Sequence, residues 1–223
     1  MTSAPRLQFL ITAGPTREAI DPVRFLSNRS SGRMGFAIAH AAAEAGHRVT
    51  LVSGPVSLQT PVGVERRNVV SADDMFHAVA ERSADADIAV FSAAVADYKP
   101  VQVAAQKIKK GEGALSLAFE RTRDILGSMR REMKFAGVLV GFAAETENLE
   151  ANARAKLKSK SCDLIVANDV SRSSVGFDAH DNEVVLLFRR GKARWLPRMS
   201  KLEIARELVR VCEALHCERQ QGH

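Results

Sequence analysis

Residues 7–16 read LQFLITAGPT, and residues 30–45 read SSGRMGFAIAHAAAEA. The first stretch is a short apolar run that stops at Gly14-Pro15, which predicts a buried strand ending in a turn. The second stretch is rich in alanine, starts behind serine hydroxyls and stops at Gly46, which predicts a capped helix with a glycine stop. A buried strand followed by a helix is the repeating unit of an α/β fold.

The rest of the chain repeats this unit. The further strands are expected at residues 49–52, 64–70, 88–96, 115–119, 138–142 and 164–167. The further helices are expected at residues 72–82, 124–135, 148–160 and 202–215, and a hairpin at residues 183–197. Apolar strands that alternate with helices pair in parallel and carry helices on both faces. With no linker or composition break, residues 1–223 are predicted to form one α/β domain: a doubly wound, mostly parallel, Rossmann-like three-layer fold with a small β-hairpin appendage.

Composition narrows the class of protein. The chain has 223 residues, 46% of them hydrophobic, and 32 basic against 26 acidic side chains leave a net charge of +6. The three cysteines, Cys162, Cys212 and Cys217, are odd in number and lack CxxC spacing, which argues against a disulfide framework or a zinc site. No apolar run is long enough to span a membrane and no signal-peptide core is present, so a cytoplasmic location is expected. The positive charge favours an anionic partner: a nucleic acid, a membrane surface or a phosphorylated small molecule.

Three predicted strands end in small residues followed by a polar group. These ends are Gly14-Pro15-Thr16, residues 92–98 (SAAVADY) and residues 141–146 (GFAAET). In open α/β sheets, ligands bind beyond the carboxyl ends of the strands, so we expect a ligand site where these three ends meet.

Several features there suit phosphate, although each has a plain structural alternative. Residues 30–32 either only cap a helix or offer their hydroxyl and N–H groups to a phosphate. The basic run 107–110 is either a solvated loop or folds back towards Asp97, where a lysine and a carboxylate hold a nucleoside triphosphate and its Mg²⁺. Lys156 and Lys160 share one helix face, which is either solvated or phosphate-binding.

Two further residues have similar alternatives. Asp124 either caps a helix or marks exposed N–H groups, and Phe142 either packs in the core or stacks on a base. The sequence has neither the GxGxxG dinucleotide fingerprint nor a GxxxxGK[ST] loop.

Taken together, these segments closely resemble one family, phosphopantothenate–cysteine ligase (phosphopantothenoylcysteine synthetase). The matching segments run in order from about residue 9 to the last helix and cover nearly the whole chain. They are residues 11–18 (ITAGPTRE), 21–25 (DPVRF), 27–32 (SNRSSG), 34–35 (MG), 93–98 (AAVADY), 107–110 (KIKK), 141–146 (GFAAET), 167–169 (AND), 176–177 (GF) and 200–201 (SK).

The resemblance implies a ligase of coenzyme A biosynthesis. Such an enzyme joins 4′-phosphopantothenate and L-cysteine with CTP through an acyl-cytidylate, and it releases CMP and pyrophosphate. The resemblance further implies Mg²⁺ or Mn²⁺, no flavin, and a homodimer, with the 183–197 hairpin as a plausible interface element. Many bacterial relatives carry a fused, flavin-dependent decarboxylase that uses the product. This chain is then either a stand-alone ligase that associates with a separate decarboxylase or a ligase domain of a longer protein.

The resemblance also implies roles for particular residues. Lys107 and Asn28 would be catalytic, Lys107 on the triphosphate and Asn28 in the cysteine step. Asp97 would bind nucleotide and metal, while Arg24, Asn28, Ser30 and Gly32 would bind substrate. The remaining nucleotide-binding residues would be Phe91, Ser92, Ala93, Arg123, Asp124, Ile125, Leu126, Phe142, Lys156 and Lys160.

One departure bears on the nucleotide. Many bacterial relatives read Asn-Pro-Asp-Ile where this chain has Thr122-Arg123-Asp124-Ile125, which leaves the choice of CTP or ATP open. The alternative enzyme is a nucleotide-binding oxidoreductase on a Rossmann-like fold, which the missing glycine fingerprint disfavours. A basic nucleic-acid-binding module is disfavoured by the 5% aromatic content, because single-strand binders stack bases on aromatic rings.

Overall fold

The computed structural model describes residues 5–145, 147–169 and 181–221. Within these residues, eight strands form one central sheet in the order β12-β11-β10-β9-β6-β1-β4-β5. Its strands are β1 (Gln8–Ala13), β4 (Arg48–Ser53), β5 (Val64–Asn68), β6 (Ile88–Phe91), β9 (Val138–Glu145), β10 (Leu164–Asp169), β11 (Asp181–Phe188) and β12 (Arg194–Ser200). In this sheet the six neighbouring strands β10, β9, β6, β1, β4 and β5 are parallel. Strands β11 and β12 add an antiparallel edge. The predicted fold class is therefore confirmed, and the predicted hairpin continues the sheet as this edge.

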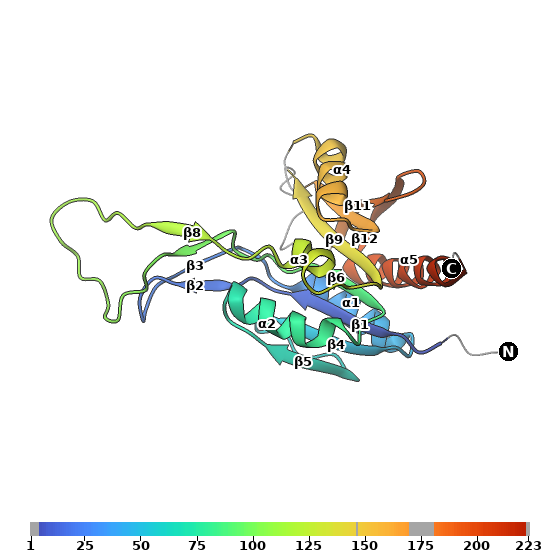
Figure 1. Cartoon of the computed structure of the whole chain (residues 1–223), viewed down its shortest axis with the longest axis horizontal. Helices are drawn as coiled ribbons and strands as arrows, with labels where there is room; N and C mark the ends of the chain where they lie inside the picture. The colour runs from blue at the N-terminus through green and yellow to red at the C-terminus, as the bar shows by residue number, and fades with distance from the viewer. Residues whose placement is uncertain (1–4, 146, 170–180, 222–223) are drawn as a thin grey trace.

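Five helices cover the sheet: α1 (Arg33–Glu44), α2 (Ala72–Ser83), α3 (Ile125–Arg131), α4 (Leu149–Ser159) and α5 (Lys201–Gln221). Helices α1 and α5 share one apolar core with a face of the sheet. Helices α2, α3 and α4 share a second core with the opposite face. The sheet strands supply residues to both cores because successive strand side chains point to opposite faces. The result is the three-layer arrangement of Figure 1. None of the described helices combines the length and apolar composition needed to cross a bilayer.

Two antiparallel ribbons, not anticipated from the sequence, project from this body. The strands are β2 (Arg17–Ala19) and β3 (Phe25–Ser27) in one ribbon and β7 (Tyr98–Pro100) and β8 (Phe119–Arg121) in the other. We call residues 17–27 and 98–121 the arm, which extends to one side in Figure 1. A backbone hydrogen bond of 3.0 Å from Ala104 to Ile20 joins its two ribbons. Residues 115–119 were expected to form a strand, but β8 begins only at Phe119, because β7 offers just three partners. The Ala118 carbonyl adds one bond, accepting from the Val101 N–H at 3.0 Å.

Candidate active site

A cavity of about 740 Å³ opens at the carboxyl ends of the parallel strands. The ends of β1, β6 and β9, the start of α1 and the loop that enters α3 all reach it. The sequence predicted a ligand site at this edge because three strand ends carry small residues, and the structure brings those ends together. Thr146, Gly176 and Phe177 of the resemblance motifs lie outside the described residues.

Small residues let the β1 and β6 ends approach α1. Gly14 and Gly32 have φ angles of 74° and 75°, a left-handed conformation that disfavours residues with a Cβ. A Cβ on Gly35 would lie 2.5 Å from the Ala13 Cβ and 2.6 Å from the Ser92 Oγ. The helix therefore packs directly on the strand ends, and its first turn lines the cavity.

The start of α1 faces the cavity. Gly32 is the N-cap residue, and as a glycine it has no side chain to cap the helix. The Ser30 hydroxyl instead accepts a hydrogen bond of 3.3 Å from the Gly32 N–H. The positive end of a helix favours an anion, and residues 30–33 line the cavity at this end of α1.

The loop after β6 is held in a fixed shape by β1. The Ser92 hydroxyl donates to the Thr12 carbonyl at 2.7 Å, and the Ala96 N–H donates to the Thr16 hydroxyl at 2.9 Å. Across the cavity mouth, the Asn28 Nδ2 donates to the carbonyls of Ala94 and Val95 at 3.0 and 3.2 Å. These bonds fix the Asn28 carboxamide over the loop that carries Asp97.

A second polar cluster lies on the α3–α4 side. The Asp124 carboxylate caps α3 by accepting from the Gly127 N–H at 3.0 Å, and it also accepts from the Lys160 Nζ at 2.7 Å. Burial raises the pKa of Asp124, but the hydrogen bonds from Lys160 and Gly127 outweigh burial and hold the pKa below its usual value. The Lys156 Nζ donates to the Phe142 carbonyl at 2.7 Å. Both lysines are thus held at the cavity by hydrogen bonds, while Lys158 on the same helix is exposed and does not line it.

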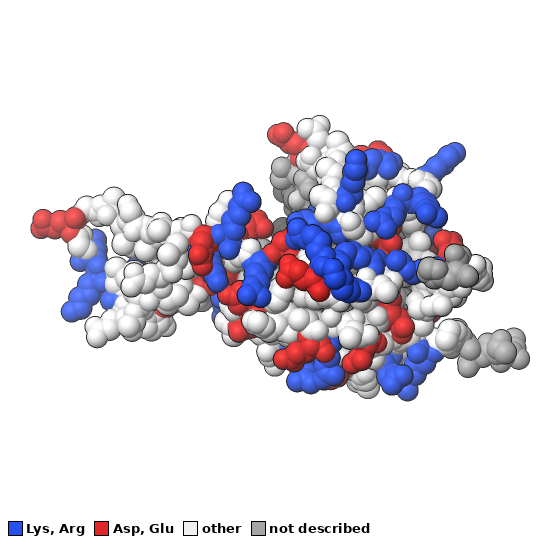
Figure 2. Space-filling view, in the orientation of Figure 1, with Lys and Arg blue, Asp and Glu red and all other residues white. Residues whose placement is uncertain are grey.

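The cavity is strongly positive. Its described lining residues include seven cationic side chains and two carboxylates. The cations are Arg29, Arg33, Arg121, Arg123, Lys156, Lys160 and Lys201; the carboxylates are Asp97 and Asp124. Figure 2 shows basic side chains gathered around α3 on one face of the body. A wall with this charge balance suits a ligand that carries several negative charges.

Fourteen of the sixteen predicted site residues line this cavity. They are Asn28, Ser30, Gly32, Phe91, Ser92, Ala93, Asp97, Arg123, Asp124, Ile125, Leu126, Phe142, Lys156 and Lys160.

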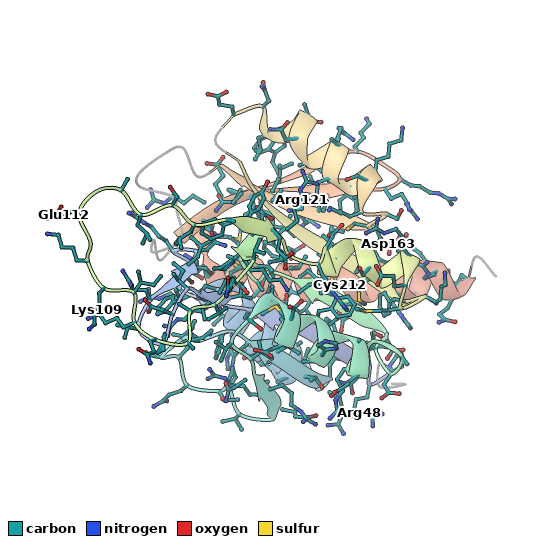
Figure 3. The ribbon with its side chains drawn as sticks, turned by 60° about the vertical axis from the view of Figure 1, so that its left-hand side comes forward. Arg48, Lys109, Glu112, Arg121, Asp163 and Cys212 are labelled. Atoms are coloured by element: carbon teal, nitrogen blue, oxygen red, sulfur yellow. The ribbon has the colours of Figure 1, made fainter. Side chains whose placement is uncertain are left out.

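The other two, Arg24 and Lys107, lie on the arm. Arg24 donates to the Ile108 carbonyl at 2.8 Å, and the Ile108 N–H donates to Asp21 at 3.1 Å, so the arm holds the 107–110 run to itself. Figure 3 shows the neighbouring Lys109 and Glu112 on the outlying loop, away from Arg121, which lines the cavity.

A divalent metal fits this site only together with a phosphorylated ligand. Among the described residues, no group of three or more His, Cys, Asp or Glu side chains could hold a metal. Asp97 is an exposed carboxylate at the cavity. Mg²⁺ is commonly bound by one or two carboxylates and the phosphates of its substrate, and Asp97 suits that arrangement.

The buried cysteines are not nucleophiles of this site. Neither Cys162 nor Cys212 lines the cavity. Burial raises the pKa of the Cys162 thiol to about 12, so the reactive thiolate is scarce at neutral pH.

Sequence reasoning missed several lining residues: Arg29, Arg33, Arg121, Asn168, Asn182 and Lys201. Asn168 follows the buried run of β10, so the rule applied to the other strand ends would have found it. Asn182 had no comparable signal, because its place follows from an antiparallel strand that starts at this edge.

Comparison with known proteins places the chain in a family. Residues 5–215 match the model of the DNA/pantothenate metabolism flavoprotein C-terminal domain. The Coenzyme A biosynthesis bifunctional protein CoaBC of Bacillus subtilis is 50% identical over 96% of this chain and 53% of its own length. The protein of the same name from Vibrio vulnificus is 47% identical over 92% of this chain and 52% of its own length. The chain thus spans about half the length of these curated relatives.

A solved structure agrees with this placement. The C-terminal domain of Coenzyme A biosynthesis bifunctional protein CoaBC has a TM-score of 0.81 and 42% identity, covering 96% of this chain and 98% of that one. The family match extends over most of the residues that build the central sheet, all five helices and the cavity. The chain therefore belongs to the family of the DNA/pantothenate metabolism flavoprotein C-terminal domain.

Proposed function

We propose that this chain is a phosphopantothenate–cysteine ligase, a carbon–nitrogen ligase of coenzyme A biosynthesis. It joins 4′-phosphopantothenate and L-cysteine with CTP and releases CMP and pyrophosphate. The observation that carries the proposal is the cavity, where the described lining sets seven cations against two carboxylates at the strand ends that bear the ligase-like motifs. A carboxylate and a triphosphate repel each other, and joining them requires such a wall.

The first step activates the pantothenate carboxylate. One carboxylate oxygen attacks the α-phosphorus of CTP, a new P–O bond forms, and pyrophosphate leaves with the electron pair of the broken P–O bond. Lys156 and Lys160 offset the negative charge of the triphosphate. Asp97 would help to hold Mg²⁺ or Mn²⁺, which would neutralise further phosphate charge. The first turn of α1 lines the cavity and presents its positive helix end to an anionic group of either substrate.

The second step forms the amide. The cysteine nitrogen attacks the acyl carbonyl carbon, CMP leaves with the bonding pair of the C–O bond, and the nitrogen loses its proton. Asn28 holds the acyl group for this attack, because its carboxamide is fixed over the loop after β6. Holding both reactants in one cavity removes much of the entropic barrier to joining them.

Residues 122–125, which differ from the Asn-Pro-Asp-Ile of many bacterial relatives, are held by several contacts. The Thr122 hydroxyl donates to the Ala96 carbonyl at 2.6 Å, and the Thr122 N–H donates to the Asp97 carbonyl at 3.0 Å. The Arg123 guanidinium lies 4.6 Å from the centre of the Phe76 ring. These contacts fix the segment where relatives carry proline. CTP is the nucleotide proposed here, with ATP as the competitor to test.

The arm supports a homodimer. Of the eleven large hydrophobic side chains that are exposed among the described residues, eight lie on the arm. They are Val23, Phe25, Leu26, Tyr98, Val101, Val103, Leu115 and Phe119. Apolar side chains gathered on a projecting element mark an interaction surface, and a second copy of the chain is the partner proposed here. In such a dimer Lys107 and Arg24 act at the partner's cavity. The 183–197 hairpin forms an edge of the central sheet and stays a second candidate interface element.

The cellular setting follows from the reaction. The chain acts in the cytoplasm as a single ligase domain, residues 1–223, and passes its product to a flavin-dependent decarboxylase in the same or a separate chain. The chain itself needs no flavin, and neither a nucleic acid nor a membrane is a partner.

One incubation tests the proposal. Purified chain with Mg²⁺, CTP, 4′-phosphopantothenate and cysteine is expected to yield phosphopantothenoylcysteine, detected by mass spectrometry, with equal amounts of CMP and pyrophosphate. Failure to form product with either CTP or ATP would contradict the ligase assignment. Oxidation of NADH or NADPH by the chain would favour the oxidoreductase alternative.

A further inference from the structure

Two asparagines at the inner end of the cavity have no assigned role. Asn168 and Asn182 both line it, and their Oδ1 atoms are buried without a hydrogen-bond partner among the described residues. Asn182 is only 6% exposed. A buried polar atom without a partner destabilises the folded protein, so such an atom in a binding cavity points to a ligand that supplies the missing bond.

The two asparagines lie near each other on neighbouring strands of the sheet. Asn168 pairs with Val184 across β10 and β11, and Asn182 is two residues before Val184 on β11. The pairing of β11 with β12 shifts register between Asn182 and Val184, yet all three residues line the same cavity. In a regular ladder, diagonal neighbours are about 7–8 Å apart, a span that one small molecule bridges. The face of the sheet at Asn168 and Val184 is that of α1 and α5, because Val166 and Val184 belong to the core shared with those helices.

This position separates the pair from the nucleotide cluster. Helices α3 and α4, which position Asp124, Lys156 and Lys160, pack on the opposite face of the sheet. The asparagines therefore suit a group that reaches the reacting centre from the other side.

The side chains around the two asparagines indicate which chemical groups a ligand at this place would carry. Carboxamide oxygens accept hydrogen bonds from an amine, and they do so without the full negative charge that would favour the protonated, non-nucleophilic form. Val184 supplies an apolar wall at the same place, and Lys201, at the start of α5, supplies a positive charge. An amine, a carboxylate and a short apolar side chain are the three groups of cysteine.

We propose that Asn168 and Asn182 bind the α-amino group of cysteine and orient it towards the acyl carbonyl, beside the apolar wall of Val184. This inference rests on the proposed ligase function. It makes the two asparagines binding residues of the second step, with no part in the first.

Two assays on one set of variants test the assignment. The first step is followed without cysteine, as phosphopantothenate-dependent exchange of labelled pyrophosphate into CTP. The second is followed as the KM for cysteine in the complete reaction. For Asn182→Ala and Asn168→Ala we expect roughly tenfold higher KM for cysteine, and exchange within about twofold of wild type. Asn68→Ala on β5, an exposed asparagine away from the cavity, serves as the matched control and is expected to change neither.

A further variant serves as the control for misfolding. Because the Asn182 Oδ1 is unpartnered, Asn182→Leu is expected to melt at or above the wild-type temperature while it shows the same rise in KM for cysteine. A rise in the KM for phosphopantothenate with loss of exchange would assign the pair to the other substrate and overturn the inference. An unchanged KM for cysteine with normal exchange would overturn it as well. Absence of exchange in the wild-type chain would instead contradict the proposed function on which the inference rests.

Discussion

At the scale of single residues, the cavity depends on lysines whose positions are set by particular acceptors. Lys160 bonds the Asp124 carboxylate and Lys156 bonds the Phe142 carbonyl, so both ammonium groups are held at the cavity before a ligand arrives. Cations fixed in advance stabilise developing charge without the cost of reorganising during the reaction. Lys158, two residues from each of them and so on another side of the helix, is exposed.

This difference between neighbouring lysines predicts a mutational contrast. The proposed function places the Lys160 charge on the phosphates, and charge-assisted hydrogen bonds contribute roughly 1.5–3 kcal/mol. Lys160→Gln is therefore expected to lower the rate of pyrophosphate exchange by roughly 10- to 100-fold. Lys158→Gln is the matched control and is expected to leave the rate of exchange near that of wild type. Equal losses in the two variants would show that the lysines act only through the general charge of α4.

The Asp124–Lys160 pair also predicts a pH dependence of stability. The folded state holds the pKa of Asp124 below its unfolded value, so the ionised carboxylate stabilises the fold at neutral pH. That contribution is lost as the pH falls through the lowered pKa. Urea unfolding at several pH values is expected to show Asp124→Asn as less stable than wild type at pH 7, with the difference shrinking below pH 4. A difference that stays constant down to pH 2 would exclude this linkage.

At the scale of elements, the helices are positioned by two kinds of interaction. Their caps can be predicted from the sequence, whereas their contacts with distant segments cannot. Ser71 and Asp74 form a capping box at the start of α2. The Glu18 carboxylate also accepts a hydrogen bond of 2.8 Å from the Ala72 N–H in the first turn of this helix. The cap can be read from a four-residue pattern, whereas Glu18 comes from β2 of the arm. Glu18 thereby ties the root of the arm to the body.

The cap of α2 predicts a local loss of stability. Ser71→Ala removes the acceptor of the 3.1 Å bond from the Asp74 N–H, and loss of a serine N-cap costs about 1 kcal/mol. Thermal or urea unfolding is expected to show that decrease in the free energy of unfolding. Ligase activity at 25 °C is expected to remain, since Ser71 does not line the cavity. A drop in activity without a drop in stability would give Ser71 a role beyond the cap.

At the scale of the whole molecule, the body and the arm have separate tasks. The body carries fourteen of the predicted site residues in one cavity, while the arm carries Lys107, Arg24 and most of the exposed apolar side chains. The arm projects to one side of the body (Figure 1), and neither Lys107 nor Arg24 lines the cavity. A dimer that exchanges arms would bring both sets of residues together.

Mixing two inactive variants tests this arrangement. Lys107→Gln and Lys160→Gln are each expected to lose most activity, because the proposed function assigns each lysine a contact with the triphosphate. If Lys107 acts on the partner's cavity, heterodimers formed by unfolding and refolding the mixture contain one intact site. Activity is then expected to recover to about one quarter of the wild-type value, because random pairing makes half of the dimers mixed and each mixed dimer has one working site. No recovery, with dimers confirmed by sedimentation, would show that each arm serves its own cavity.

The sequence predicted the layered fold well because it rests on local signals. Apolar strands, alanine-rich helices and glycine stops lie in short windows, and nearly all the expected helices and strands form. The arm escaped prediction because residues 17–27 have no clear periodicity and their strands pair only three residues each. The cavity followed from the strand-end rule and the family resemblance, but Asn182 and the distance between Lys107 and the cavity depend on the course of the chain in space.

The central claim, that this cavity forms an acyl-cytidylate, is tested most directly by isotope transfer. Phosphopantothenate labelled with ¹⁸O in its carboxylate is incubated with CTP, Mg²⁺, cysteine and the chain. The masses of the products are then measured by mass spectrometry. Because a carboxylate oxygen attacks the α-phosphorus and stays there when the amine displaces the nucleotide, CMP is expected to carry one ¹⁸O and pyrophosphate none. Unlabelled CMP, with ¹⁸O in pyrophosphate or inorganic phosphate, would contradict the account.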